Sequence, residues 1–342
     1  MIEYPSLDKP TSGSIRFNTD SSKLEIYNGN QWWEIEATSP EFHTGGTRGL
    51  FGGGETPSLT DRIDFISVDT TGNASDFGDI SFARRNLASA SDRSRLVFTG
   101  GYTSGPATYY NTLEFVTMAT TGDTTDFGDL TVQRSRLGSF GSRTRGFAAG
   151  GLGSPDTNVI DFFTIQSLGN ANDFGDLSSQ RFGVSGSQSP TRGLIFGGAV
   201  GPTQQNLIEY VTMSTTGNAS DFGDLVQNSG QGTAGSNAVR AVAGAGYSAP
   251  GTVEKDMMYV TIATLGNALE FGDLVQNRIE CGAGACSRTR IVVPGSFTSN
   301  NSPSDHIDYH EIMTTGDFID FGDMVGNTNG TSGGSNGHGG LG

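Results

Sequence analysis

The chain has 342 residues, of which 52 are glycine, about twice the usual share. Its 20 basic and 36 acidic residues give a formal net charge of −16, which argues against a nucleic-acid partner because phosphate binding needs a basic surface. Hydrophobic residues make up 34%, enough for a packed core, and no apolar run is long enough to predict membrane insertion.

Residues 1–40 do not repeat and predict a small β-meander. Three strands are expected, at Ser14–Asn18, Lys23–Tyr27 and Gln31–Ile35. The pair Asn28-Gly29 between the last two strands predicts a hairpin turn of type I′. Three strands of this size bury too little to be stable alone. We therefore expect them to dock on the rest of the chain, on copies of themselves or on another protein.

Residues 41–342 consist of repeats that share the tripeptide Phe-Gly-Asp. It occurs six times at spacings of 47 to 50 residues, always after an acidic residue. A glycine followed by Asn or Asp stands five residues before each phenylalanine and predicts a tight turn. An aromatic residue stands twelve before it. The anchors are Phe77, Phe127, Phe174, Phe222, Phe271 and Phe321.

Each repeat predicts four short strands. In the second repeat they are Leu87–Ser91, Arg95–Thr99, Thr112–Met118 and Asp126–Val132. The third strand carries apolar residues on both faces, which is typical of a strand packed between neighbouring sheets. A period near 48 residues with four strands per unit predicts an all-β fold, a six-bladed β-propeller.

The last repeat predicts how this ring closes. Residues 327–342 cover the place of a first strand, and Thr47–Gly52 reads as a second strand without a first. We expect a C-terminal strand at about Gly330–Asn336 to pair beside Arg48–Phe51 and complete the first sheet. Such closure removes the exposed strand edges that favour aggregation.

Two charged columns run through the repeats. An arginine begins each second strand, and an aspartate ends each Phe-Gly-Asp. Their equal number predicts inter-strand Arg–Asp bonds that brace the sheets. The arginines are Arg48, Arg95, Arg145, Arg192, Arg240 and Arg290. The aspartates are Asp79, Asp129, Asp176, Asp224, Asp273 and Asp323. Calcium held by these acidic turns is the alternative, and no other cofactor is expected.

Other chemical motifs are weak. Asp-Phe-Gly is also a kinase signature, but the remaining kinase motifs are missing. His306, Asp308 and His310 alternate and could share a strand face as metal ligands, although drift of the repeat explains them better. Cys281 and Cys286 are expected to be free thiols. No catalytic residue is predicted, and the chain is interpreted as a non-enzyme.

The repeats resemble Kelch repeats over residues 41–342. In the second repeat the shared order is Arg85, then Val97-Phe98-Thr99-Gly100-Gly101, then Phe115, then Phe127 where Kelch repeats usually have tryptophan. The resemblance implies a Kelch-like propeller. The fixed Asp-Phe-Gly-Asp is a departure from the Kelch pattern, so the cellular partners of Kelch proteins are not implied.

The segment Gly13–Ile35, with Ser14-Ile15-Arg16-Phe17-Asn18 and Gln31-Trp32-Trp33-Glu34-Ile35, resembles a module of structural and fibre proteins of tailed bacteriophages. Glycine-rich propellers with repeated Asp-Phe-Gly-Asp also resemble virion proteins of marine and cyanobacterial phages. These resemblances imply a virion component, assembled in the host cytoplasm and present in several copies. Residues 1–40 would attach it to other virion proteins.

The function implied is host attachment through the propeller loops, with a surface glycan or protein as partner. A decoration or connector protein and an enzyme that acts on host glycans are the alternatives. Tyr109, Tyr110 and Phe297 could stack on sugars or pack within their loops. The most variable connectors are the candidate contact loops: Glu55–Thr60, Tyr102–Tyr110, Leu152–Thr157, Val200–Gln205 and Ser296–Ser304.

Overall fold

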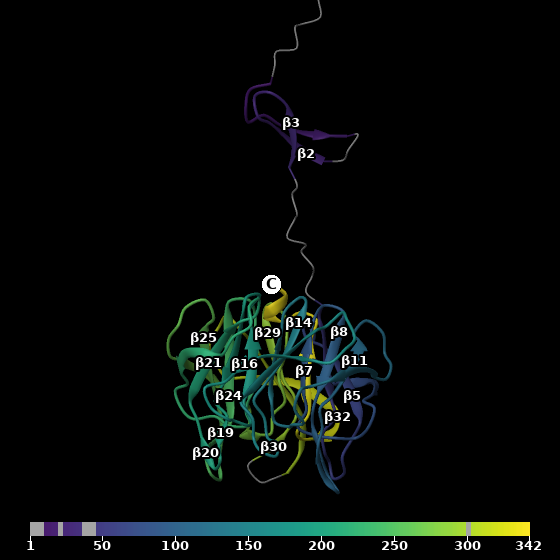
Figure 1. The fold of residues 1–342 in the computed structure, drawn as a ribbon, viewed down its shortest axis with the longest axis vertical. Helices are drawn as coiled ribbons and strands as arrows, with labels where there is room; N and C mark the ends of the chain where they lie inside the picture. The colour runs from purple at the N-terminus through teal and green to yellow at the C-terminus, as the bar shows by residue number, and fades with distance from the viewer. Residues whose placement is uncertain (1–9, 20–22, 36–45, 299–301) are drawn as a thin grey trace, which may run out of the picture. The chain divides into compact units, whose positions relative to one another are not determined.

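The structure, a computed structural model, describes residues 10–19, 23–35, 46–298 and 302–342. The chain divides into two compact units, Met1–Thr44 (unit 1) and Gly45–Gly342 (unit 2) (Figure 1). The boundary predicted between residues 40 and 41 lies outside the described residues. Both units are all-β, and the one helical element described is the 3-10 helix η1 (Gly339–Leu341). Within the described residues, no helix has the length and apolar character needed to cross a membrane.

Unit 1 is an antiparallel sheet of three strands in the order β1 (Ile15–Asn18), β2 (Lys23–Tyr27) and β3 (Trp32–Ile35). The three predicted strands are confirmed to within one residue at each end. The type I′ turn is wrong, because Tyr27 pairs with Trp32 and four residues connect the strands. Asn28 Oδ1 accepts the backbone N–H groups of residues 30 and 31, both at 2.9 Å, and this local turn lengthens the loop.

Unit 2 contains six antiparallel four-stranded sheets, five of them built from one continuous segment each. Their strands are β7 (Ala88–Ser91), β8 (Arg95–Thr99), β11 (Thr112–Thr117) and β12 (Thr125–Asp129); β13 (Gly138–Gly141), β14 (Arg145–Ala149), β15 (Val159–Thr164) and β16 (Asn172–Asp176); β17 (Ser185–Gln188), β18 (Arg192–Phe196), β21 (Leu207–Thr212) and β22 (Ser220–Asp224); β23 (Thr233–Ser236), β24 (Arg240–Ala249), β25 (Thr252–Thr261) and β26 (Leu269–Asp273); and β28 (Ala285–Cys286), β29 (Arg290–Val293), β31 (Ser304–Glu311) and β32 (Ile319–Thr328).

The four strands predicted for the second repeat are confirmed, with one difference at the last strand. It ends at Asp129 instead of Val132. The physical reason lies in the next sheet, where the carboxylate of Asp161 accepts the backbone N–H of Thr131 at 3.0 Å and turns the chain away from the ladder.

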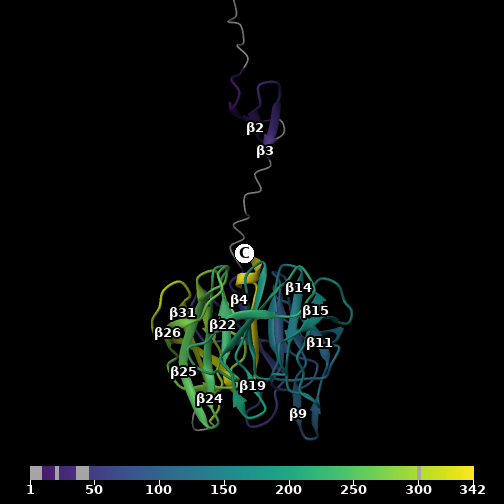
Figure 2. The same cartoon turned by 60° about the vertical axis from the view of Figure 1, so that its left-hand side comes forward.

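The sixth sheet combines both ends of unit 2. It contains β33 (Ser332–Ser335), β4 (Arg48–Gly52), β5 (Arg62–Ser67) and β6 (Ser75–Asp79). The predicted pairing of a C-terminal strand beside Arg48–Phe51 is confirmed, with Ser332 opposite Gly52. The innermost strands contact one another in the cyclic order β33, β7, β13, β17, β23, β28 and back to β33. The C-terminal segment is yellow in Figures 1 and 2 and runs among strands from earlier in the chain.

The Phe-Gly-Asp motifs form the junctions between neighbouring sheets. Gly122 donates its N–H to the carbonyl of Phe77 at 2.8 Å, and the side chain of Asp123 accepts the N–H of Asp79 at 3.0 Å. Equivalent pairs of bonds occur at all six junctions, including the one that joins Gly72-Asn73 to Phe321-Gly322-Asp323. A Cβ on Gly78 would lie 2.4 Å from the carbonyl oxygen of Gly122, so this close approach requires glycine.

The core lies between the sheets. One buried cluster joins Val97 and Phe127 of one sheet to Ala148 and Phe163 of the next, and the anchor phenylalanines are 2–3% exposed. This packing explains the apolar residues on both faces of the inner strands.

Candidate functional site

The connections between second and third strands project from one end of unit 2. Four carry extra pairing: β9 (Tyr102–Ser104) with β10 (Ala107–Tyr109), β19 (Ala199–Val200) with β20 (Thr203–Gln204), the extended ends of β24 and β25, and β30 (Phe297–Thr298) with β27 (Arg278–Ile279). Strands β19, β20 and β30 in Figure 1 and β9 in Figure 2 lie at the end opposite the C-terminus. We call this the hairpin end; its loops are residues 53–61, 100–111, 150–158, 197–206, 247–254, 294–298 and 302–303.

Sequence analysis missed one of these connections, residues 247–254. The repeat drifts there, and the Gly-Gly pair that ends most second strands is absent. The usable signal was Ala249-Pro250-Gly251, a turn sequence. In the structure β24 and β25 stay paired up to this turn, with Tyr247 opposite Val253 and Ala249 opposite Thr252.

A ring of six backbone positions surrounds the opening at this end. Each lies nine residues after its anchor phenylalanine and has a left-handed φ between 50° and 65°. Hydrogen bonds of 2.7–3.1 Å link five of the six neighbouring pairs in the ring, for example Arg136 N–H to Asn86 O and Gly330 N–H to Glu280 O. The ring residues are Asn86, Arg136, Gly183, Gln231, Glu280 and Gly330.

Charged side chains cross the opening. Arg136 and Glu280 stand opposite each other in the ring, and Arg136 Nη2 lies 2.5 Å from Glu280 Oε1. Arg85 Nη1 lies 2.5 Å from Glu55 Oε2 and 3.7 Å from Glu280 Oε2. The space open to the centre of a water molecule behind this ring is about 50 Å³. That is room for a few waters, so a larger ligand would be held at the surface of the opening.

Tyr247 lies near two of these charged residues, Glu280 and Arg136. Burial raises the pKa of its hydroxyl, the nearby Glu280 raises it further, and Arg136 opposes the rise. The hydroxyl therefore stays protonated at neutral pH. It can donate a hydrogen bond to an acceptor on a ligand.

The predicted aromatic contacts have different surroundings. The ring of Tyr109 lies 5.4 Å from that of Tyr102. Tyr110 packs 4.7 Å from Phe82, and its hydroxyl lies 3.2 Å from Thr103 Oγ1. Phe297 pairs with Ile279, the residue before Glu280. Tyr110 therefore braces its loop, whereas Tyr109 and Phe297 are half-buried on the hairpin end.

The predicted Arg–Asp bonds are wrong. Arg48 lies opposite Ser67 and Asp79 opposite Arg62, so arginine and aspartate sit at opposite ends of the sheet. Among the described residues no ion pair joins the two columns. Each arginine instead makes a cation–π contact, with its guanidinium 4.1–5.0 Å from the centre of the aromatic ring that stands twelve residues before the anchor of the same repeat. Each also donates to a backbone carbonyl outside its own sheet, as Arg48 does to Met118 at 2.8 Å.

A second arginine column, which sequence analysis missed, supplies the buried ion pairs. These arginines lie seven residues after an anchor, and their side chains are fully buried. Arg134 Nη2 lies 2.8 Å from Asp161 Oδ2, and Arg134 Nη1 donates to the carbonyl of Gly150 at 3.0 Å. Burial lowers the pKa of Arg134, and Asp161 opposes that change. The pairs are Arg84–Glu114, Arg134–Asp161, Arg181–Glu209 and Arg278–Asp308.

The two remaining sheets lack this arginine. Ser229 holds its place in the fifth repeat, and Met258 replaces the acid there, so the pair is lost as a unit. Thr328 holds its place in the closing sheet, where Asp64 pairs with Arg62 on its own strand at 2.6 Å. The fixed spacing after the anchors was the signal in the sequence, but only four of six repeats carry it.

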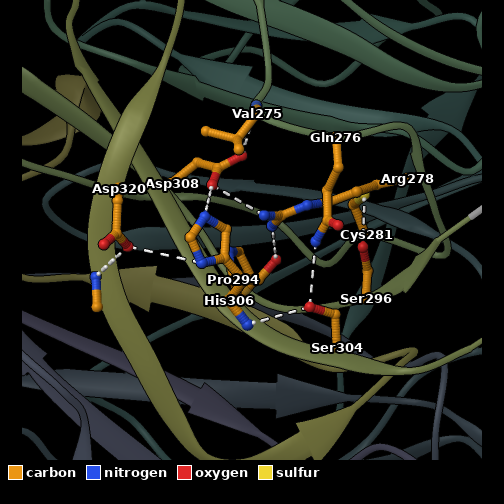
Figure 3. Close-up of polar contacts among 11 residues, drawn as sticks. Val275, Gln276, Arg278, Cys281, Pro294, Ser296, Ser304, His306, Asp308 and Asp320 are labelled. Carbon is orange, nitrogen blue, oxygen red and sulfur yellow. Dashed lines mark hydrogen bonds and ion pairs between the residues drawn. The ribbon is translucent and has the colours of Figure 1, made fainter.

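The pair Arg278–Asp308 has an added histidine (Figure 3). Asp308 Oδ1 lies 2.9 Å from Arg278 Nη2 and 3.0 Å from His306 Nε2, and His306 Nδ1 lies 3.6 Å from Asp320 Oδ1. Burial raises the pKa of Asp308, and Arg278 opposes the rise. Both ring nitrogens of His306 face carboxylates, so neither is placed to activate a nucleophile.

The predicted metal-ligand set is only partly brought together. His310 packs its ring 5.1 Å from Phe271 and lies apart from the His306–Asp308 pair. No group of three or more His, Cys, Asp or Glu that could hold a metal occurs among the described residues. Asp308 pairs with a buried arginine, as Glu114, Asp161 and Glu209 do at the same position of other repeats, which agrees with repeat drift.

Both cysteines are free thiols, as predicted. Burial raises the pKa of Cys281 to about 11 and that of Cys286 to about 12. They are therefore protonated at neutral pH and are poor nucleophiles.

The hairpin end offers charges, hydroxyls and aromatic faces, which are the contacts of a binding surface.

A scan against protein-family models found no match to this chain, and a search of curated proteins found none either.

Proposed function

We propose that the six sheets of unit 2 are the blades of a six-bladed Kelch-like β-propeller that β33 closes against β4. The cyclic contacts of the innermost strands support this arrangement. So do the six equivalent junctions, one of which joins Gly72 to Phe321, far apart in sequence. The hydrogen bonds that link five of the six neighbouring ring positions at the hairpin end give further support.

We further propose that the chain is a structural or fibre protein of a tailed-phage virion that recognises the host surface through the hairpin end. The observation that carries this is a repeated scaffold whose second-to-third connections all differ in sequence and vary in length. Binding residues are found disproportionately on such loops held by a rigid frame. The resemblance of Gly13–Ile35 to phage fibre modules supplies the setting.

The chemistry of the hairpin end suits a glycan or a polar protein surface. Arg85, Arg136, Glu55 and Glu280 offer both donors and acceptors, and Tyr109 offers an aromatic face. A single site of this kind is weak, so attachment would depend on several copies per particle. The net charge of −16 gives no support to nucleic-acid binding.

A decoration or connector role is the second candidate, and an apolar rim favours it. On the outermost strands of two neighbouring sheets, Leu269 is 59% and Ile319 54% exposed. Val275 and Val325, each six residues further along the chain, are 51% and 48% exposed. The first three repeats carry polar residues at the same places, such as Ser75 and Thr125. An apolar rim is a surface on which another virion protein could pack.

Binding of the purified full chain to host cells and to a glycan array tests these proposals. Binding that falls at least tenfold in Tyr109→Ala or Phe297→Ala supports host recognition. Leu168→Ala is the matched control, because Leu168 follows the far end of β15 and is 62% exposed. No host binding, with loss of particle incorporation in Leu269→Ser/Ile319→Ser, would favour the connector. Turnover of host polysaccharide would instead indicate an enzyme.

A further inference from the structure

Unit 1 carries an apolar face with nothing packed on it among the described residues. In the sheet register Ile15 lies opposite Ile26 and Ile26 opposite Trp33, while Phe17 lies opposite Leu24. Directly opposed residues point to the same side of a sheet, so these five side chains form one face. Phe17 is 61% exposed, Ile15 60%, Trp33 55% and Leu24 39%.

The other face of the same sheet is polar and is covered by its own side chains. Glu25 is only 6% exposed and receives Arg16 Nε at 2.7 Å and Asn18 Nδ2 at 2.9 Å. The guanidinium of Arg16 lies 4.2 Å from the centre of the Trp32 ring, and Trp32 packs 5.3 Å from Tyr27. This face thus buries the Glu25 carboxylate and Tyr27, whereas the other face leaves Ile15, Phe17, Leu24 and Trp33 exposed. Exposure of a contiguous apolar face is unusual for a folded sheet.

We propose that a second copy of this chain covers the apolar face, so that two unit 1 sheets pack face to face as a small β-sandwich. A single sheet with one apolar face must bury it against another layer. Two identical flat faces meet this need at the usual sheet spacing of about 10 Å.

The charge pattern favours a copy over a different partner. Among the side chains that the structure describes, the face contains five apolar residues and no charged one. It can therefore meet itself without like-charge contact, although the whole chain carries −16. The polar groups that would select another protein, Arg16, Asn18 and Glu25, are bonded to one another on the opposite side. Specificity for a different partner would need such groups at the contact.

The area is also sufficient. The exposed parts of these five side chains amount to roughly 500 Å² per copy, from side chains of about 150–250 Å² each. Two copies would bury about 1,000 Å², close to the lower limit of a specific interface. Nearly all of that area is apolar, as in the core of homodimer interfaces. Each pair would also carry two hairpin ends, which raises avidity for a repeated receptor.

The mass of the full chain in solution tests the pairing. Light scattering during size-exclusion chromatography should give twice the chain mass of 35.8 kDa at micromolar concentration. Phe17→Lys places like charges in the paired faces and should shift the mass to one chain. Leu168→Lys is the matched control, since Leu168 in unit 2 is 62% exposed and should leave the dimer intact.

Mixing separates loss of pairing from loss of folding. Equal amounts of Phe17→Lys and Phe17→Glu chains should recover the two-chain mass, because the charges then attract. A one-chain mass for the unchanged protein overturns the proposal, and a different partner on this face would give that result. An unchanged mass in Phe17→Lys, or no recovery on mixing, also overturns it.

Discussion

The sheet β13–β16 and the closing sheet β33-β4-β5-β6 have the same strand order but different connections. In the first, a short turn joins β13 to β14, and Ser142 Oγ accepts the backbone N–H of Arg145 at 3.0 Å. In the second, no turn joins β33 to β4. Asn336 Oδ1 nevertheless accepts the backbone N–H of Arg48 at 3.0 Å, across 288 residues of sequence. The closing sheet therefore makes the same kind of hydrogen bond as the turn in the other sheet, although no turn joins its two strands.

Side-chain hydrogen bonds hold the C-terminal segment in place of the missing covalent link. His338 Nε2 lies 2.8 Å from Ser91 O, and Arg93 and Arg143 both donate to Leu341 O, at 3.0 and 3.1 Å. Ser335 Oγ donates to Cys286 O on the neighbouring innermost strand. The comparison teaches that the repeats supply the ladders and junctions, while the sheet that lacks a turn also depends on side chains of the C-terminal segment, such as Asn336 and His338.

The largest effect should come from removing residues 327–342. This deletion takes away β33, exposes the edge of β4 and breaks the ring of innermost strands. We expect loss of most of the stability of unit 2, which for a folded domain is about 5–15 kcal/mol. Thermal unfolding followed by circular dichroism measures it. A chain lacking residues 1–44 is the control and should melt as before. An unchanged Tm in the 327–342 deletion would show that β33 does not close the ring.

Arg134→Ala should be the most damaging single substitution in the continuous sheet. It leaves the buried carboxylate of Asp161 without its partner, and such a loss costs about 3–5 kcal/mol. Urea unfolding measures the free energy. The double substitution Arg134→Ser/Asp161→Met copies the fifth repeat and should cost less than Arg134→Ala alone. A double variant that is less stable than the single one would contradict the view that the pair is lost as a unit.

His338 should make the closing sheet sensitive to acid. Its Nδ1 accepts the Gly340 N–H and its Nε2 lies against Ser91 O, so the neutral ring is satisfied. Burial lowers the pKa of His338 to about 4, from an ordinary value of 6.5, while the nearby Asp92 carboxylate opposes the change. The unfolded chain therefore binds a proton between pH 6.5 and 4 that the folded chain does not. Stability should be full above pH 6.5 and fall by up to about 3 kcal/mol as the pH drops to 4.

The variant His338→Gln isolates this effect. Burial raises the pKa of Asp64 and Asp308, which acts in the opposite direction and is common to both proteins. The unfolding free energy of the variant should therefore decline less between pH 6.5 and 4 than that of the unchanged protein. Parallel curves would show that His338 does not titrate with unfolding.

Much of the fold was predictable because its signals repeat. The Phe-Gly-Asp spacing predicted four strands per repeat, and the incomplete first and last repeats predicted the β33–β4 pairing. The Arg–Asp bonds were predicted from equal numbers alone. Strand direction would have corrected them, because a second strand begins at the end of the sheet opposite to where the fourth strand ends, as Arg48 and Asp79 do.

The opening at the hairpin end was not predictable in the same way. Its ring positions hold Asn86, Arg136, Gln231 and Glu280 as well as two glycines, so no residue type marks the left-handed backbone. The Arg136–Glu280 contact joins side chains 144 residues apart in sequence, and only the packing of several sheets brings them together. The hairpin loops were recognisable as variable segments, but their contacts depend on that assembly.

Asn336→Ala compared with Ser142→Ala gives the smallest and most specific test. Each substitution removes the side-chain acceptor for the backbone N–H of the arginine that begins the second strand, a bond worth about 0.5–1.5 kcal/mol. Ser142 Oγ also accepts the N–H of Thr144, at a longer 3.3 Å. After Ser142→Ala the turn still holds β13 beside β14, and water can reach the freed N–H, so the loss should be near the lower value. After Asn336→Ala no short connection holds β33 beside β4, so the loss should be at or above the upper value. Equal losses in urea unfolding would mean that the closing sheet does not rely on Asn336 in place of a turn.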